Sequence, residues 1–270
     1  MKKYILSLLT VSLSYLAIAQ GTSDRITKVD GSTIEGTVVE IDDKQIKYQL
    51  VGQKALRSLS TLAISEITYA NGSKESIPNR FDGFKDEGYA SGMYITKDSR
   101  DIAGLTEVGR IFSKARATLL VSPVNNVNNR ALRKLKLEAE FYGADVLLIQ
   151  ESELKHDFGD KLQTYSAVAY ALNPRPSLET VNDFITANKL YVSSISKFRR
   201  SLWFSTDNKE TFDVAVDIDN VEAVGNKVFL QVNYPGNEII NWEVVSIKDN
   251  MVTLLNHDGK VASRLILTTK

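Results

Sequence analysis

Apolar and polar residues alternate in short runs along most of this chain of 270 residues. Ile46, Tyr48 and Leu50 form one such run, and similar runs recur near the carboxyl end. A period of two places one set of side chains on a single face of a β-strand. The pair Asn71-Gly72 follows another run, and it is a strong signal for a two-residue hairpin turn. The sequence therefore predicts a β-rich chain of the α+β class.

Two stretches carry helical spacing instead. Leu132, Leu135 and Ala139 fall on one face of a helix, and Gly143 follows them. Glycine at this place is a common helix end because it adopts a left-handed conformation at little cost. Further on, Ser177 is suited to cap a second helix, since its hydroxyl can accept a hydrogen bond from a free backbone N–H. We therefore predict two helices between the β-rich segments.

Changes in these patterns divide the chain into segments. Closely spaced strands and turns are typical of a small barrel, whereas a polar, glycine-containing run is typical of a linker. We predict a small β-barrel at residues 24–80, a linker at 81–101, an α/β domain at 102–172, a linker helix at 173–189 and an antiparallel β domain at 190–270.

Residues 1–19 have the pattern of a secretory signal peptide. Lysines at the second and third positions precede an uncharged stretch that ends in Ala17-Ile18-Ala19. This small-x-small ending is what a signal peptidase cleaves. A membrane span needs about 20 apolar residues, and serine and threonine dilute this shorter stretch, so an uncleaved anchor is the weaker alternative. We expect an exported protein, periplasmic or extracellular, without a membrane span after cleavage.

Composition excludes several kinds of chemistry. The chain has no cysteine, so disulfides, thiolate metal sites, a cysteine nucleophile and a lipid-modified cysteine are excluded. Its two histidines are too few for a three-histidine metal centre. The 33 basic residues balance 33 acidic ones, which argues against a general nucleic-acid binder. We predict no cofactor and no metal, and the charge does not predict the oligomeric state.

Candidate binding residues gather in the last segment. They are Phe198, Arg199, Arg200, Trp203, Phe204 and Trp242. Aromatic side chains and arginine anchor many protein interfaces, so this set is a candidate patch for a protein or an envelope component. A buried core explains the aromatic residues as well. An alternative is a carrier whose C-terminal β domain encloses a small apolar ligand in a pocket lined by Trp203, Phe212 and Trp242.

Two other groups of polar residues have competing interpretations. Arg130, Arg133 and Lys134 make the first helix basic, which fits either an exposed helix face or a patch for anionic lipids. His156 and Asp157 could belong to a hydrolase, but that reaction also needs a nucleophile beside the histidine. A solvated hairpin loop is the simpler interpretation of these two residues. We therefore assign no catalytic residue.

Some motifs resemble known families. The first carries turn and core positions at Asp24-Arg25-Ile26, Asp30-Gly31, Ile34-Glu35-Gly36, Ile46-Lys47-Tyr48, Ile64-Ser65-Glu66-Ile67-Thr68-Tyr69 and Asn71-Gly72. This run resembles the N-terminal domain of many exported Bacteroidota proteins, which implies an Sm- or SH3-like barrel and an exported location. It implies no chemistry.

The middle segment carries a second resemblance. Its helix-to-strand phrase at residues 143–149 and the later residues 166–170 resemble compact α/β domains of the RcsF and YbjQ type. Such domains occur in envelope and stress-sensing proteins. RcsF-type domains contain disulfides, and this chain has no cysteine. The resemblance therefore implies a fold and does not imply a redox or sensor role.

A possible internal repeat relates the two ends of the chain. Residues 34–46 match residues 240–252 at a spacing of 206, with apolar residues and an acidic turn in common. Any two β-hairpins share alternation, so strand pairing must decide between a repeat and chance. Together, these features predict an exported, non-enzymatic binding or scaffold protein of the cell envelope.

Overall fold

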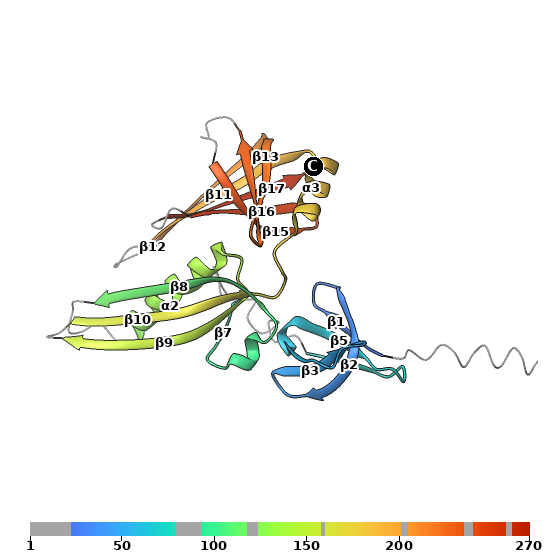
Figure 1. Ribbon diagram of the computed structural model, residues 1–270. Coiled ribbons are helices and arrows are strands. Elements are labelled where there is room, and N and C mark those ends of the chain that lie inside the picture. The colour runs from blue at the N-terminus through green and yellow to red at the C-terminus, as the bar shows by residue number, and fades with distance from the viewer. Residues whose placement is uncertain are drawn as a thin grey trace, which may run out of the picture. The chain divides into compact units, whose positions relative to one another are not determined.

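The computed structural model describes residues 23–78, 93–117, 124–157, 160–200, 205–234, 240–257 and 261–270, without the side chains of 124–125, 156–157, 200, 205–209 and 240. Three sheets and, among the described residues, two α-helices make up the structure (Figure 1). This confirms the predicted β-rich α+β class. The predicted signal peptide, residues 1–19, lies outside the described residues. Neither described helix is long and apolar enough to span a bilayer.

The chain forms two compact units, Met1–Arg80 and Phe81–Lys270. The first holds a six-stranded antiparallel sheet in the order β4-β3-β2-β1-β5-β6. Its strands are β1 (Asp24–Lys28), β2 (Thr33–Ile41), β3 (Gln45–Leu50), β4 (Leu56–Ser60), β5 (Ile64–Thr68) and β6 (Lys74–Ser76). The predicted hairpin at Asn71-Gly72 is confirmed, because it joins β5 to β6. Alternation also indicated part of the core, since Ile46 and Tyr48 of the predicted run are buried.

The predicted small barrel is not seen as a closed structure. Among the described residues, β4 and β6 are the two edges of the sheet, and no ladder joins them. A buried 3-10 helix, Thr61–Ala63, carries the chain directly from β4 to β5. These two strands are therefore joined by a tight turn of the backbone and do not pair with each other.

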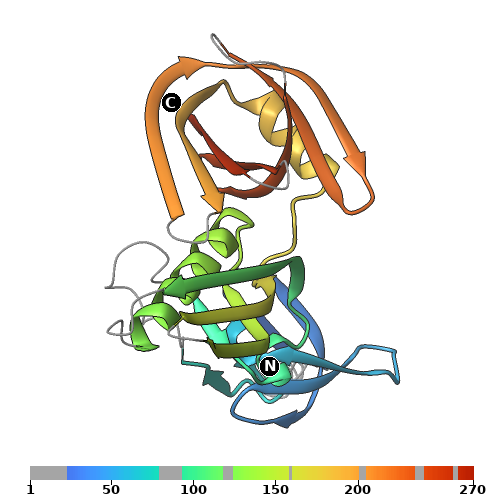
Figure 2. The ribbon, with the colours of Figure 1, turned by 90° about the vertical axis from the view of Figure 1, so that its left-hand side faces the viewer.

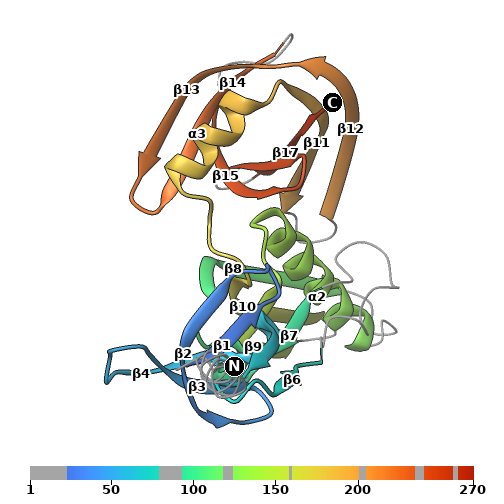
Figure 3. The same cartoon turned by 90° about the vertical axis from the view of Figure 1, so that its right-hand side faces the viewer.

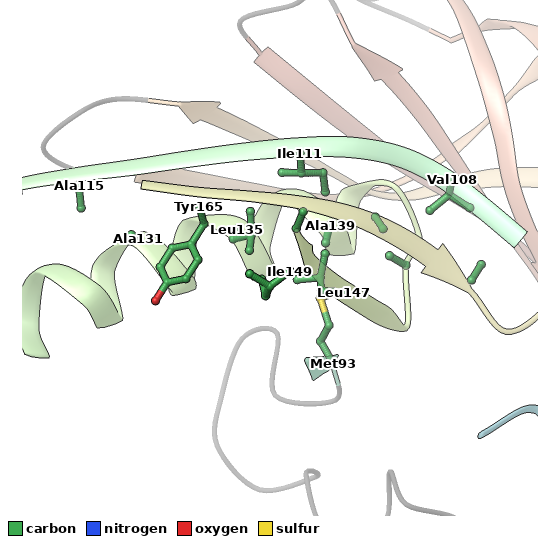
Figure 4. Packing of buried hydrophobic residues seen from close by; sticks show 14 of the residues in the cluster. Met93, Val108, Ile111, Ala115, Ala131, Leu135, Ala139, Leu147, Ile149 and Tyr165 are labelled. Atoms are coloured by element: carbon green, nitrogen blue, oxygen red, sulfur yellow. The ribbon is translucent and has the colours of Figure 1, made fainter. Parts of the chain in front are cut away.

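The second unit begins with a four-stranded sheet in the order β7-β9-β10-β8. Its elements are β7 (Tyr94–Thr96), β8 (Thr106–Ala117), α2 (Val124–Phe141), β9 (Val146–Asp157) and β10 (Asp160–Ala171). Helix α2 covers one face of this sheet, where Leu135 and Ala139 pack against Ile111 and Leu147 (Figure 4). The predicted helical stripe is thus the buried face of α2.

Part of the predicted linker is structured. Within residues 81–101, Tyr94–Thr96 forms β7, which pairs in parallel with β9, and a 3-10 helix (Ser99–Ile102) follows. A strand of three residues is too short to show alternation, and the polar residues around it dominate the local composition. Sequence pattern therefore could not identify β7.

The rest of the second unit is a seven-stranded sheet wrapped around a helix. Its elements are α3 (Leu178–Ala187), β11 (Leu190–Arg200), β12 (Ser205–Ala215), β13 (Asp217–Val224), β14 (Lys227–Asn233), β15 (Ile240–Lys248), β16 (Met251–His257) and β17 (Val261–Thr269). Strands β12 and β13 are opposite edges of the sheet, yet only Val216 separates them along the chain. The sheet must therefore curl, and it does so around α3 (Figure 2 and Figure 3).

Strand pairing supports the internal repeat. Val38 pairs with Tyr48 between β2 and β3, and Val244 pairs with Leu254 between β15 and β16. These pairs correspond at the spacing of 206, and the register shifts directly after Val38 and after Val244. The neighbouring strands β1 and β14 also pair in equivalent registers. The similarity therefore extends over a three-stranded unit, although β5 follows its unit along the chain and β13 precedes its own.

Helix α2 and the seven-stranded sheet share a hydrophobic core. Its buried members are Leu137, Phe141, Phe198, Val245, Leu255 and Ala262. The Arg175 guanidinium strengthens the junction by donating to the carbonyl oxygens of Tyr142 at 2.8 Å and Val245 at 3.0 Å. The segments predicted as an α/β domain and a β domain are consequently packed against each other within one compact unit.

Candidate functional site

The predicted aromatic and arginine set does not form a patch with the residues that can be placed. Phe198 is only 2% exposed and Trp242 only 1%. Arg199 is exposed, while Trp203, Phe204 and the side chain of Arg200 lie outside the described part of the chain. Buried rings cannot contact a partner in this conformation, so Phe198 and Trp242 are removed from the candidate surface.

Both buried rings have a clear packing role. The ring of Phe198 lies 5.9 Å from that of Phe141 between centroids, in the core shared with α2. Trp242 belongs to the core inside the curled sheet, where Val181 of α3 is fully buried. Phe212 of the predicted carrier pocket is 38% exposed and lies on the edge strand β12. Trp242 and Phe212 thus lie in different surroundings, one in a packed core and one at the surface.

The basic helix is not a continuous exposed surface. Arg133 is exposed, but Lys134 is only 3% exposed and donates through Nζ to the carbonyl oxygen of Lys114 at 3.1 Å. Burial, together with the positive charge of Arg130, lowers the pKa of Lys134 from 10.5 to about 8. Such a buried amine cannot contribute to a patch for anionic lipids.

The residues of the hydrolase alternative can be placed only by their backbone. His156 and Asp157 end β9, opposite Lys161 and Asp160 of β10, and their side chains lie outside the described set. Among the residues that are described, no three histidine or carboxylate side chains converge as metal ligands would.

A notch in the four-stranded sheet is the best candidate site. Strand β7 pairs with β9 only over Tyr94–Thr96, opposite residues 146–148. Strand β9 continues to Asp157 (Figure 1), and in the described part of the chain no strand pairs with the outer edge of residues 149–157. This stretch offers backbone N–H and C=O groups to an incoming chain.

A β-bulge lies where the notch begins. Ser166 of β10 pairs with Glu151, whereas the next residue, Ala167, pairs with Ile149. Gln150 is therefore the extra residue in β9. A bulge bends its strand and redirects side chains, and bulges are frequent beside functional sites. Here the bulge breaks the strict alternation along β9 at the start of the notch.

An open depression of about 500 Å³ lies at the notch. It is lined by Lys97, Phe112, Ile149, Gln150, Glu151, Ser152, Glu153, Thr164 and Ser166. Phe112, Ser166 and Glu151 form one row across β8, β10 and β9. This row lies on the face opposite α2, because Ser113, the next residue of β8, points to α2 and donates to the carbonyl oxygen of Ala131 at 2.8 Å.

Charge is unevenly distributed along the depression. Lys97 directly follows β7 and lies at the start of the notch, and neighbouring Asp98 is paired with Arg100 at 2.8 Å. Glu151 and Glu153 project further along β9, and Glu153 contacts Lys155 at 3.3 Å. The depression therefore has a positive end at Lys97 and two carboxylates, Glu151 and Glu153, along the free edge, the second of them in an exposed ion pair with Lys155.

Sequence reasoning missed this site. The available signal was Phe112, an apolar residue that shares the period of Arg110 and Lys114 in β8 and is 44% exposed. A large ring among solvated charged positions is more informative than aromatic residues in general. The end of β7, and with it the free edge, could only be found in the structure.

A second, smaller depression of about 280 Å³ lies at the junction of α2 and β15. Beside it, Arg175 and Glu243 form an ion pair at 3.4 Å, with side chains only 8% and 9% exposed. Burial lowers the pKa of Arg175, and the carboxylate of Glu243 opposes that change. Lys227 also contacts Glu243, at 2.7 Å. The contacts of Arg175 hold the two halves of the unit together, while Lys227 and Glu243 join neighbouring strands β14 and β15 of the curled sheet, so we assign all of them a structural role.

Comparison with protein families, with characterised proteins and with solved structures gives no match for this chain. The chemistry of the site is therefore argued from its own residues.

Proposed function

We propose that this chain is an exported, non-enzymatic binding protein of the cell envelope that recognises a protein or envelope component at the notch. The observation that carries the proposal is the free edge of β9 together with an open depression that extends from this edge across β10 to the exposed ring of Phe112 in β8. Export is supported by the signal-peptide pattern of residues 1–19. Such a protein acts by presenting a shaped surface to a partner.

The lining of the depression suits recognition. Phe112 offers apolar area, Gln150 offers an amide, and Thr164 and Ser166 offer hydroxyl groups. A few polar groups around an aromatic contact orient a ligand while the ring supplies buried area. Because the depression is open along β9, it fits an extended partner better than an enclosed small molecule.

A photo-crosslinking experiment tests this function. Phe112 is replaced by benzoylphenylalanine in the mature chain, and the protein is irradiated in an envelope preparation from its own cells. The control is the same replacement at Phe212, which has a similar exposure of 38% against 44%. We expect one specific adduct at position 112 that excess unmodified protein suppresses, and none at position 212.

The opposite results have distinct meanings. If position 112 gives no adduct above that at position 212, the notch is not the binding site. An adduct with a small apolar molecule at position 212 alone would favour the carrier alternative.

A further inference from the structure

The free edge of β9 has the properties of a docking site for a β-strand. Residues 149–157 pair with β10 on one side only within the described structure. A strand directs its backbone groups alternately to its two sides, so half of the groups in this stretch face outward. An extended peptide satisfies such groups by adding a strand to the sheet.

Strand β7 already occupies the first part of this edge. It ends at Thr96, opposite Leu148, and the depression begins at the next residues, Lys97 and Ile149. A bound strand would therefore continue the sheet where β7 leaves it. On the face that carries Phe112, the depression extends inward from that strand over β9 and β10, so it can receive a side chain that leans over β9.

The position of Lys97 determines the direction of the bound strand. Lys97 follows β7 at the start of the notch and lines the depression together with Ile149. A strand antiparallel to β9 would bring its C-terminal end to this position, whereas a parallel strand would bring its N-terminal end. A free carboxylate is attracted to an ammonium and a free amine is repelled, so the antiparallel direction is favoured.

The acidic residues determine the preferred side chains. Glu151 and Glu153 are two residues apart in β9 and pair with Ser166 and Thr164 on the exposed face. Residues directly opposite each other in antiparallel strands share a face and interact. Basic residues at alternate positions of the peptide would therefore meet the two carboxylates.

We infer that the notch binds the free C-terminal end of an extended peptide with alternating basic residues, antiparallel to β9 and with its carboxylate at Lys97. This inference rests on the proposed function and specifies its ligand class. The juxtaposition of a free strand edge, a cation at one end and two carboxylates along it carries the inference.

The test uses the mature full-length chain and a defined probe. The probe is the peptide Val-Lys-Val-Lys-Val with a fluorescent label on its N-terminus and a free C-terminal carboxylate, followed by fluorescence anisotropy. A second peptide has a C-terminal amide and is otherwise identical. Because an exposed ion pair contributes modestly, we expect the acid to bind roughly threefold to tenfold more tightly than the amide.

Variants of the chain test whether the difference in affinity between the acid and the amide peptide arises at the notch. Lys97→Ala should reduce the ratio of acid to amide affinity to about one, and Lys197→Ala, at an exposed lysine of β11, should leave it unchanged. The double variant Glu151→Gln and Glu153→Gln should weaken both peptides, because both retain the lysines.

Backbone methylation separates strand addition from simple charge attraction. Two versions of the acid peptide carry N-methyl groups on alternate amides: one on the odd-numbered residues and the other on the even-numbered residues. A bound strand directs only one of these two sets of N–H groups toward β9. Methylation of that set should abolish binding, and methylation of the other set should not. Equal behaviour of the two versions would rule out strand addition.

Three other results would overturn the inference. They are equal affinity of acid and amide, a ratio that persists in Lys97→Ala, and failure of the acid peptide to bind at all. A specific adduct at position 112 together with any of these results would preserve the proposed function and reject only this ligand class. Absence of both the adduct at position 112 and the binding of the acid peptide would reject the proposed function and the ligand class together.

Discussion

Gly143 ends α2 in a left-handed conformation, with a φ of +66°. Its N–H donates to the carbonyl oxygen of Glu140 at 3.0 Å, as in a helix C-cap. A Cβ atom at this position would overlap the side chain of Val245 in β15. The glycine predicted from sequence as a helix stop therefore has a second role, since it allows β15 to approach the end of α2.

Gly143→Ala should consequently destabilise the second unit by roughly 2–4 kcal/mol, from backbone strain together with overpacking. The matched control is Gly225→Ala, where φ is +63° and nothing lies within 4 Å of a new Cβ. That variant should lose only about 1 kcal/mol. Urea unfolding followed by circular dichroism measures both values, and equal losses would contradict the packing role of Gly143.

Lys134 makes the stability of the second unit depend on pH. The folded pKa of about 8 lies below the ordinary value of 10.5, so between these values the unfolded chain binds more protons than the folded one. Stability therefore rises with pH across this window. Below about pH 8 the amine is protonated in both the folded and the unfolded chain, so the folded state carries the full free-energy cost of burying the ammonium.

Replacement by methionine provides the corresponding test. The Lys134→Met variant should lack this contribution to the pH dependence, so the difference between its free energy of unfolding and that of wild type should decrease as pH rises from 8 to 10. Urea unfolding at a series of pH values measures the difference. Parallel curves for the two proteins would contradict the lowered pKa.

Helix α3 supports the curled sheet from within. The Ser177 hydroxyl accepts a hydrogen bond from the N–H of Thr180 at 3.2 Å, as the sequence predicted. One turn further on, Val181 is fully buried in the core that contains Trp242. A weakened helix start therefore affects the packing of the whole sheet.

Ser177→Ala should lower the free energy of unfolding of the second unit by about 1 kcal/mol, the usual effect of removing a helix cap. Ser177→Asp should preserve most of the stability because a carboxylate also caps a helix N-terminus. Chemical denaturation of the two variants provides the comparison. A loss in the aspartate variant as large as that in the alanine variant would argue against capping.

Strands and helices of ordinary length were predictable from sequence, whereas the elements that pack against each of them in the fold were not. Alternation identified β3 and β14, and helical spacing identified α2, because a buried face leaves a regular trace in the sequence. The three-residue β7 leaves no such trace. Phe198 and Trp242 were misleading for a similar reason: composition shows that aromatic residues are present, but only the fold determines which elements cover them.

At the scale of the whole molecule, the two compact units should unfold in separate steps. Residues from α2 and from the curled sheet share one core, so the second unit should give a single transition even though its sequence suggested two domains. Differential scanning calorimetry of the full chain should therefore show two transitions. A third transition would indicate that the two halves of the second unit unfold independently.

The Arg175→Ala variant shows which of the two calorimetric transitions belongs to the second unit. It removes the buried partner of Glu243 and two hydrogen bonds across the junction, which should cost roughly 3–5 kcal/mol. Only the transition of the second unit should move to lower temperature. A shift of the other transition would contradict the division of the chain.

The pairing of β11 with β17 has a consequence for biogenesis. Strand β11 is synthesised before β17, so one of its two neighbours is missing while the intervening residues are made. Until then, β11 can pair only with β12, and the edges of β11 and β16 that β17 will join have no partner from this sheet. The complete sheet can therefore form only after residues 261–269 have been made.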